Sequence, residues 1–269
     1  MDPTTIFAVA LLLFVALIFS PLGLGGGVLY VPIFLYLLDW GMKESITGSL
    51  LLVFMVALGS SLSHKKSGYT DSTIANAGRI SAIPFAIVGT LLAGILIDKV
   101  GEVGIKIIAA AILIFIIERT ITRMRKEQSE NKTPPNFEPL KKKYQVGTAL
   151  AGTASGILGI GGGAILVTLN RSLLKMDAHK AAGTSYQIGA TIVPVALLSH
   201  IVLDGVVHSL FNSVGIVLTI LIPLLAFTCA FCGAKYAIQH ISNKIVTIIF
   251  LAAVSLSLCR YFIDFALMF

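Results

Sequence analysis

The stretch SPLGLGGGVLYVP, residues 20–32, places Gly23, Gly25, Gly26 and Gly27 inside an apolar run. A second stretch, SGILGIGGGAILVT at residues 155–168, repeats the same G-x-G-G-G spacing. Each glycine in the interior of a helix costs about 1 kcal/mol relative to alanine. Two such clusters therefore indicate two places where an apolar helix is interrupted for a reason.

The composition around these clusters is that of a membrane protein. Hydrophobic residues make up 56% of the 269 residues and charged residues only 12%, whereas soluble domains carry about 25% charged residues. The charges collect in short islands between long uncharged runs, which is typical of a multi-pass α-helical membrane protein. The runs are continuous and do not alternate, so the pattern excludes a β-barrel. The start lacks a basic n-region, and we expect the first segment to be retained.

The net charge of +7 does not indicate a nucleic-acid partner. Most of the excess, +4, lies in the polar stretch RMRKEQSENKTPPNFEPLKKK at residues 123–143, and cytoplasmic loops of membrane proteins are generally rich in Lys and Arg. This segment is charged and contains prolines, and we expect it to be an exposed, partly flexible linker. The three cysteines lie in apolar segments of the last third and predict no disulfide framework.

The chain reads as a duplication. Besides the glycine clusters, three markers recur in the same order at nearly one offset: Thr47-Gly48-Ser49 with Ala182-Gly183-Thr184, Ser63-His64 with Ser199-His200, and Ile83-Pro84 with Ile222-Pro223. We therefore predict two homologous membrane repeats, residues 1–121 and 143–269, on either side of the linker 122–142.

The length of the first uncharged run predicts a broken helix. Residues 3–38 as one straight helix would span roughly 54 Å, while the hydrocarbon core is about 30 Å thick. We expect each glycine segment to form a helical hairpin with its tip near the bilayer midplane. Three ordinary spans follow in each half, at 45–62, 73–97 and 103–119, and then at 178–199, 210–234 and 243–263.

Loop charge favours one of two topologies. If every segment crosses once, the repeats are parallel and the loop with Arg171, Lys175 and Lys180 lies outside, against the positive-inside tendency. If each glycine segment returns to the side it came from, the basic loops and the linker all become cytoplasmic and both termini lie outside. The two repeats then have inverted orientations, as in many secondary transporters. We favour this second arrangement.

Glycine tips at mid-membrane depth suit an anion. A helix that starts near Gly26 or Gly162 points its N–H groups and the positive end of its dipole inward, and two converging helix N-termini form an anion site without a buried cation. The alternative is that these small residues only let helices pack closely. The predicted substrate-binding residues are Gly25, Gly26, Gly27, Gly161, Gly162, Gly163, Ser20, Ser155, Thr47, Ser49, Thr184, Ser185, Tyr186, Gln187 and Cys229.

The duplicated G-x-G-G-G motif, the Thr47-Gly48-Ser49 and Gly183-Thr184 elements and the eight-segment hydropathy around a polar middle resemble the TauE/SafE sulfite exporter family. The resemblance covers nearly the whole chain. It implies a multi-pass protein of the cell membrane that transports sulfite or organosulfonates such as sulfoacetate, coupled to an ion gradient. Val31-Pro32 pairs with Val167-Thr168, so the two glycine segments are not fully symmetric.

Other residues allow alternative interpretations. Cys229 and Cys232 share a helix face within an apolar span, which indicates packing, with sulfur contact to a substrate as the second interpretation. His64 and His200 occupy matching places at span ends, as interfacial residues or as proton carriers. Asp204 and His208 are spaced to pair at the surface.

No metal site, no cofactor and no enzyme chemistry is predicted, because the sequence shows no His-rich cluster and no activated nucleophile. The expected partners are a small anion, the lipid bilayer and a coupling ion. The leading functional hypothesis is a secondary transporter, and the alternative is a small-anion channel.

Overall fold

The computed structural model describes residues 3–127, 135–206 and 215–268, and within these ranges it is built of helices. The first half contains α1 (Pro3–Phe19), α2 (Gly27–Leu37), α3 (Met42–Lys66), α4 (Ser72–Val100) and α5 (Glu102–Glu127). The second half contains the short η1 (Glu138–Leu140), then α6 (Lys141–Leu158), α7 (Gly163–Ser172), α8 (Ala178–Asp204), α10 (Ile216–His240) and α11 (Asn243–Met268). The middle of the predicted linker, 128–134, lies outside the described residues, as do residues 207–214 with His208.

Five of these helices are long and apolar enough to cross a membrane: α3, α4 and α8 over their full lengths, α10 from Leu218 and α11 from Thr247 to Leu267. α1 and α2 are shorter apolar helices, which agrees with the prediction that the first uncharged run is broken. α5, predicted as a span at 103–119, is less apolar because it carries Lys106, Glu118 and Arg119. Large exposed side chains such as Phe85, Leu91 and Ile95 lie along α4, on a surface suited to lipid.

The two halves pack in the same way. α3 and α8 lie against each other at the centre, and each also contacts a long helix of the opposite half, α10 for α3 and α4 for α8. α1 lies along α10, as α6 lies along α4. Both of these contacts are close because a glycine faces backbone: a Cβ on Gly233 of α10 would clash with the carbonyl of Leu17, and a Cβ on Gly152 of α6 would clash with that of Ala82.

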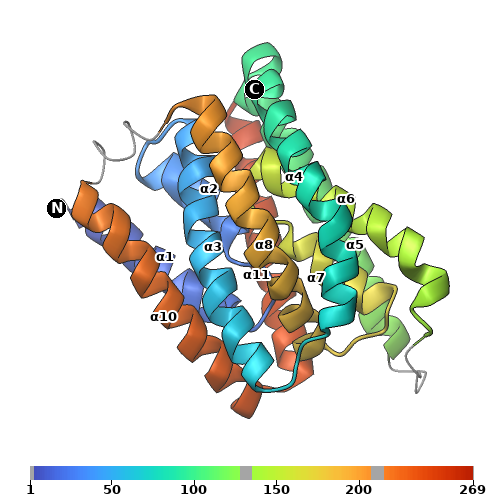
Figure 1. Ribbon diagram of the computed structural model, residues 1–269. Helices are drawn as coiled ribbons and strands as arrows, with labels where there is room; N and C mark the ends of the chain where they lie inside the picture. The colour runs from blue at the N-terminus through green and yellow to red at the C-terminus, as the bar shows by residue number, and fades with distance from the viewer. Residues whose placement is uncertain (1–2, 128–134, 207–214, 269) are drawn as a thin grey trace.

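The long helices run in both directions (Figure 1): α3 and α10 run down in this view, and α4, α8 and α11 run up. Two ion pairs fix the ends of these helices. Lys43 at the start of α3 lies 3.3 Å from Asp98 at the end of α4, while Lys180 at the start of α8 lies 3.5 Å from Asp71, the N-cap of α4. α3 and α4 are therefore antiparallel, and α4 and α8 start at the same end of the molecule.

The two short helices α2 and α7 end at opposite ends of the α5–α11 pair. Near the end of α2, Tyr36 donates a 2.8 Å hydrogen bond to Asp264 near the end of α11, and Asp264 also binds Lys106 near the start of α5. Near the end of α7, Arg171 instead lies beside Arg119, in the later part of α5.

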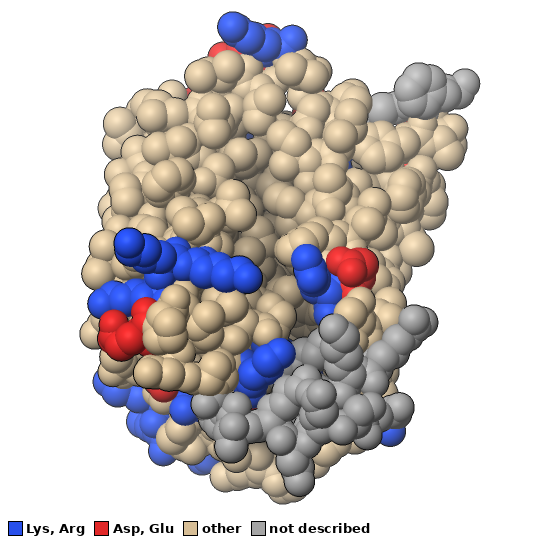
Figure 2. Space-filling model, turned by 90° about the vertical axis from the view of Figure 1, so that its right-hand side faces the viewer, with Lys and Arg blue, Asp and Glu red and all other residues tan. Residues whose placement is uncertain are grey.

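Charge is distributed unevenly over the surface. Figure 2 shows Lys and Arg gathered over the lower part of this face, while the upper part is largely uncharged apart from a small charged group at the top. At the lower end of Figure 1, where α3 and α10 end and α8 and α11 begin, the chain is rich in lysine: Lys65 and Lys66 end α3, Lys175 lies between α7 and α8, and Lys235 and Lys244 lie near the end of α10 and the start of α11. A largely uncharged belt beside a basic end is the pattern expected of a membrane protein whose basic side faces the cytoplasm.

Candidate functional site: the crossing of two glycine loops

Two glycine loops interrupt the short helices. The first glycine loop, residues 20–26, joins α1 to α2, and the second, residues 159–162, joins α6 to α7. Three glycines in each segment have positive φ: Gly23 (81°), Gly25 (72°) and Gly26 (87°), and then Gly159 (67°), Gly161 (73°) and Gly162 (66°). Residues with a Cβ rarely adopt this left-handed backbone conformation, so the positions of these glycines are set by the path of the backbone.

The loops cross each other in the interior of the protein. A Cβ on Gly27 would lie 2.5 Å from the Cα of Ile160 in the second loop, and a Cβ on Gly163 would clash with the carbonyl oxygen of Gly23 in the first. The first turn of each short helix therefore lies directly against the loop of the other half. We call this region, residues 23–27 and 159–163, the crossover.

Each half also holds the loop of the other half by a serine. Ser49 of α3 donates a 2.8 Å hydrogen bond to the carbonyl of Gly159, and Ser185 of α8 donates a 3.1 Å hydrogen bond to the carbonyl of Gly23. These bonds make Ser49 and Ser185 the equivalent residues. The sequence pattern had paired Ser49 with Thr184, one residue earlier.

A small cavity lies at the crossover. The space that the centre of a water molecule can reach is about 10 Å³, enough for one water, so the cavity is too small for a sulfonate in this conformation. Its lining residues are Gly23, Leu24, Gly25, Gly161, Gly163, Val53, Ala57, Gly189, Val193, Ser185 and Tyr186. None of the lining residues is charged, so the groups that face an occupant are backbone and hydroxyls.

Tyr186 is the main polar side chain at the first loop. Its hydroxyl donates a 2.7 Å hydrogen bond to the carbonyl of Phe19 and accepts a 3.3 Å hydrogen bond from the N–H of Gly25. The long second bond leaves the Gly25 N–H weakly held. A bound acceptor that bonds more strongly would draw this N–H away from the tyrosine.

The helix N-termini at the crossover have no side-chain caps. α2 begins after Gly26 and α7 begins after Gly162, and neither N-cap residue supplies a side-chain acceptor. The first N–H groups of a helix have no intrahelical partner, and here both sets are buried. The N–H groups of both helices need a hydrogen-bond acceptor, and the dipoles of α2 and α7 favour an acceptor with negative charge.

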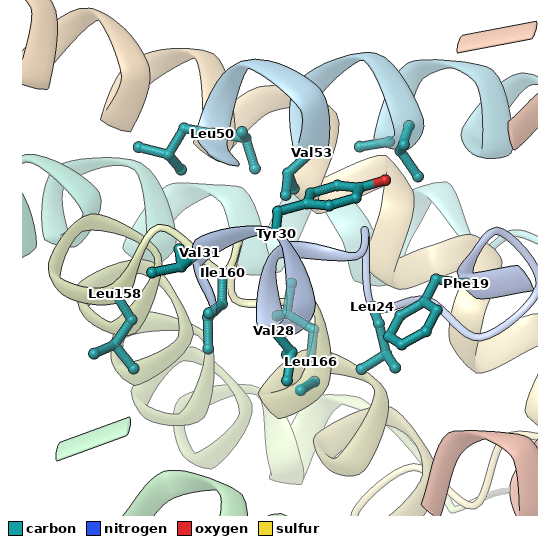
Figure 3. Close-up of a cluster of buried hydrophobic side chains, with 14 of the residues drawn as sticks. Phe19, Leu24, Val28, Tyr30, Val31, Leu50, Val53, Leu158, Ile160 and Leu166 are labelled. Atoms are coloured by element: carbon teal, nitrogen blue, oxygen red, sulfur yellow. The ribbon is translucent and has the colours of Figure 1, made fainter. Parts of the chain in front are cut away.

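The surroundings of the crossover are apolar. Figure 3 shows Val28, Val53, Ile160 and Leu166 among the side chains around it, contributed by α2, α3, the second loop and α7. All four are buried. Hydrogen bonds to an anion are stronger in such a water-poor environment than at the surface.

Tyr30 of α2 is a residue of the site that the sequence analysis missed. Its side chain is fully buried, and its hydroxyl has no hydrogen-bond partner among the described residues. A Cβ on Gly26 would lie 2.8 Å from this hydroxyl, so the group lies at the crossover. The available signal was the duplication, since the matching position in the second half is Leu166.

Of the predicted residues, the six glycines, Ser49, Ser185 and Tyr186 come together at the crossover. Ser20 and Ser155 end the helices that lead to it: Ser20 donates to Leu17 at 2.7 Å, and the buried hydroxyl of Ser155 has no partner among the described residues. Cys229 of α10 is half-buried, within electrostatic reach of Tyr30.

Three predicted residues bond elsewhere. Thr47 donates to the carbonyl of Lys43 on its own helix at 2.9 Å. Thr184 accepts a 3.0 Å hydrogen bond from the N–H of Asp71, and the amide of Gln187 lies 3.3 Å from the hydroxyl of Ser72. Thr184 and Gln187 therefore join the start of α4 to α8.

Comparison with known proteins gives two matches. The family model described as "Sulfite exporter TauE/SafE" matches residues 8–261, which include both glycine loops and every helix that forms the crossover. A protein of Haemophilus influenzae described as "Probable membrane transporter protein" is 27% identical over 188 residues, 67% of each chain. No solved structure matches the chain.

Proposed function

The chain belongs to the TauE/SafE sulfite exporter family and is a multi-pass membrane transporter; we propose that it is a secondary transporter that exports small sulfur-containing anions. Sulfite and organosulfonates present several acceptor oxygens on one compact group. Hydrogen-bond donors alone can hold such a group, without a buried Lys or Arg. The proposal assigns the protein transport across the cell membrane and no chemical conversion of the solute.

The single observation that carries the proposal is the crossover. Two uncapped helix N-termini from opposite halves lie against each other's loops, and the cavity between them is lined by hydroxyls, backbone and apolar side chains. In the proposed complex, the N–H groups of residues 25–27 and 161–163 bind the oxyanion. Ser49, Ser185, Tyr186 and Tyr30 supply hydroxyls around it.

We further propose that residues 1–121 and 143–269 are inverted repeats joined by a cytoplasmic linker at 122–142. The packing of each half matches that of the other, and α2 and α7 leave the crossover toward opposite ends of α5 and α11. Both features are expected for repeats related by an axis in the membrane plane. The basic lower connections then face the cytoplasm, and the crossover lies near the midplane.

Transport by this arrangement requires the cavity to enlarge and to open to one side at a time. The crossover is bounded by α3 of the first half and α8 of the second, so rocking one half against the other changes its exposure. This is the alternating access of inverted-repeat carriers. A permanently open small-anion channel, the alternative, needs a continuous pore through the same region.

Thermal-shift measurements on the purified protein test the proposal. Sulfite, sulfoacetate and thiosulfate should each raise the melting temperature if they bind, because a ligand of the native state stabilises it by mass action. Ser185→Ala should reduce the shift. Ser199→Ala should preserve it, because Ser199 of the same helix bonds to Val195, one turn before it, and lies away from the cavity lining. Absence of any shift with all three anions would refute the substrate class.

Counterflow in proteoliposomes distinguishes a carrier from a channel. A carrier takes up labelled sulfoacetate faster when unlabelled sulfoacetate is present on the trans side, because a loaded site returns faster than an empty one. A channel shows no such acceleration, and that result would favour the alternative function.

A further inference from the structure

His64 of α3 is a buried histidine with one open nitrogen. Its side chain is fully buried, and its Nδ1 lies 2.9 Å from the carbonyl oxygen of Ser60. A carbonyl only accepts, so Nδ1 carries the hydrogen and Nε2 holds a lone pair in the neutral ring. That Nε2 is buried without a hydrogen-bond partner among the described residues.

The position of His64 connects the crossover to the basic end of the molecule. Its ring centroid lies 5.8 Å from that of Tyr186, whose hydroxyl accepts from Gly25 at the first loop. On its other side, the N–H of Tyr69 donates a 2.9 Å hydrogen bond to the His64 carbonyl, so the α3–α4 connection covers it. His64 is about three helical turns from Val53, which lines the cavity.

The other titratable groups around His64 come from α8, from α3 itself and from the α3–α4 connection, which contributes Tyr69. α8 contributes Tyr186 and His179, and His179 interacts electrostatically with His64. On α3 itself the next residues are Lys65 and Lys66, both exposed. Lys66 extends over the ring of Phe231 on α10, 5.3 Å from its centroid.

The matching histidine of the second half has both nitrogens occupied. Nδ1 of His200 lies 2.6 Å from the carboxylate of Asp204, and Nε2 lies 2.7 Å from the carbonyl of Gly156. Each nitrogen of this ring therefore has a partner within hydrogen-bond distance, unlike Nε2 of His64. Four residues after His64 the chain has Gly68 in place of a carboxylate.

We infer that His64 is the proton-binding residue that couples protonation to anion binding at the crossover. The Nε2 lone pair takes a proton that enters from the basic end, and the resulting imidazolium places a positive charge on the route between that end and the first loop. No covalent bond to the solute forms or breaks. The inference rests on the proposed function and specifies its coupling ion as the proton.

The test uses isethionate, a sulfonate that stays ionised across the titration range of histidine, so that only the protein titrates. Its dissociation constant is measured for the purified protein between about pH 8 and about pH 4. Wild-type affinity should rise about tenfold on acidification, a usual size for coupled sites, and binding should take up protons from a weakly buffered solution. His64→Gln should bind with an affinity that does not change with pH.

His240→Gln is the matched control, because His240 is exposed at the end of α10 and bonds to Tyr236 of its own helix. It should retain the wild-type pH profile. A pH-independent wild-type affinity, or an unchanged pH profile in His64→Gln, would overturn the inference while the proposed function stands. No isethionate binding at any pH overturns both. If His64→Gln does not fold, wild-type proton uptake decides, and binding without uptake refutes the role of His64.

Discussion

The two halves of this protein share a backbone plan but differ in the side chains around it. In each half, a serine donates a hydrogen bond to a glycine carbonyl in the loop of the other half: Ser49 bonds the second loop and Ser185 bonds the first. The histidines that follow on the same helices differ sharply. Both ring nitrogens of His200 lie within hydrogen-bond distance of a partner, Asp204 or Gly156. Nε2 of His64, whose ring packs near that of Tyr186, has no such partner among the described residues.

The comparison shows a backbone frame that the two halves share, with the polar side chains gathered at one of the two loops. Tyr30 corresponds to Leu166, and Tyr186, by the serine equivalence, corresponds to Leu50. The first loop therefore meets two tyrosine hydroxyls where the second meets two leucines. A carrier needs two equivalent conformations and one binding event, and this arrangement suits both needs.

The largest effect on stability should come from breaking the His200 pair. Asp204→Ala leaves Nδ1 of the buried His200 ring without its partner, and losing a hydrogen bond to a carboxylate costs up to about 3 kcal/mol. Asp98→Ala is the control, because its pair with Lys43 is exposed and such pairs contribute about 0–1 kcal/mol. Unfolding free energies in mixed micelles give both values. Equal losses would mean that His200 is no more fixed in place than a surface residue.

A smaller loss of stability should follow from adding a methyl group at the crossover. Gly163→Ala places a methyl group against the carbonyl of Gly23, and overpacking of this kind costs about 1–3 kcal/mol. Gly94→Ala in α4 meets open space and has an ordinary helical φ, so it should be neutral or slightly stabilising. Thermal midpoints of the two variants compare them directly. A tolerated Gly163→Ala would show that the loops do not cross as closely as described.

The smallest effect on stability, but a specific effect on binding, should come from Tyr30→Phe. Its hydroxyl bonds to no described residue, so the unfolding free energy should change by less than about 1 kcal/mol. If that hydroxyl bonds the anion, sulfonate affinity should fall about tenfold, because a hydrogen bond to a charged group is worth about 1.5–3 kcal/mol. Tyr186→Phe should instead lose stability, since its hydroxyl bonds Phe19 and Gly25. Unchanged affinity in Tyr30→Phe would remove Tyr30 from the site.

Much of the helix plan could be predicted from the sequence. Charge-free runs and glycine spacing gave the broken segments and the approximate spans, because burial in lipid and positive φ leave direct marks on composition. The constant offset between the two halves predicted which loop residues correspond. That Ser49 corresponds to Ser185 became clear only from their hydrogen bonds.

The rest depended on contacts between helices far apart in the chain. Asp204 pairs with His200 four residues before it on α8, and the contact that joins this ring to α6 is the one with Gly156. The pairing with His208 that the sequence suggested lies outside the described residues. Thr184 and Gln187 read as site residues by proximity to Ser185, yet successive helix positions face different neighbours, and theirs is α4. Tyr30 carried no motif, and only its unpartnered hydroxyl singles it out.

The central claim is that one anion binds where the two glycine loops cross. Crystals grown with 2-bromoethanesulfonate test it most directly, because anomalous scattering locates the bromine and the adjoining density locates the sulfonate. The account predicts a sulfonate between the N-termini of α2 and α7, within hydrogen-bond distance of Ser185 and the N–H of Gly25. A sulfonate bound away from both loops, in crystals that show clear bromine signal, would contradict it.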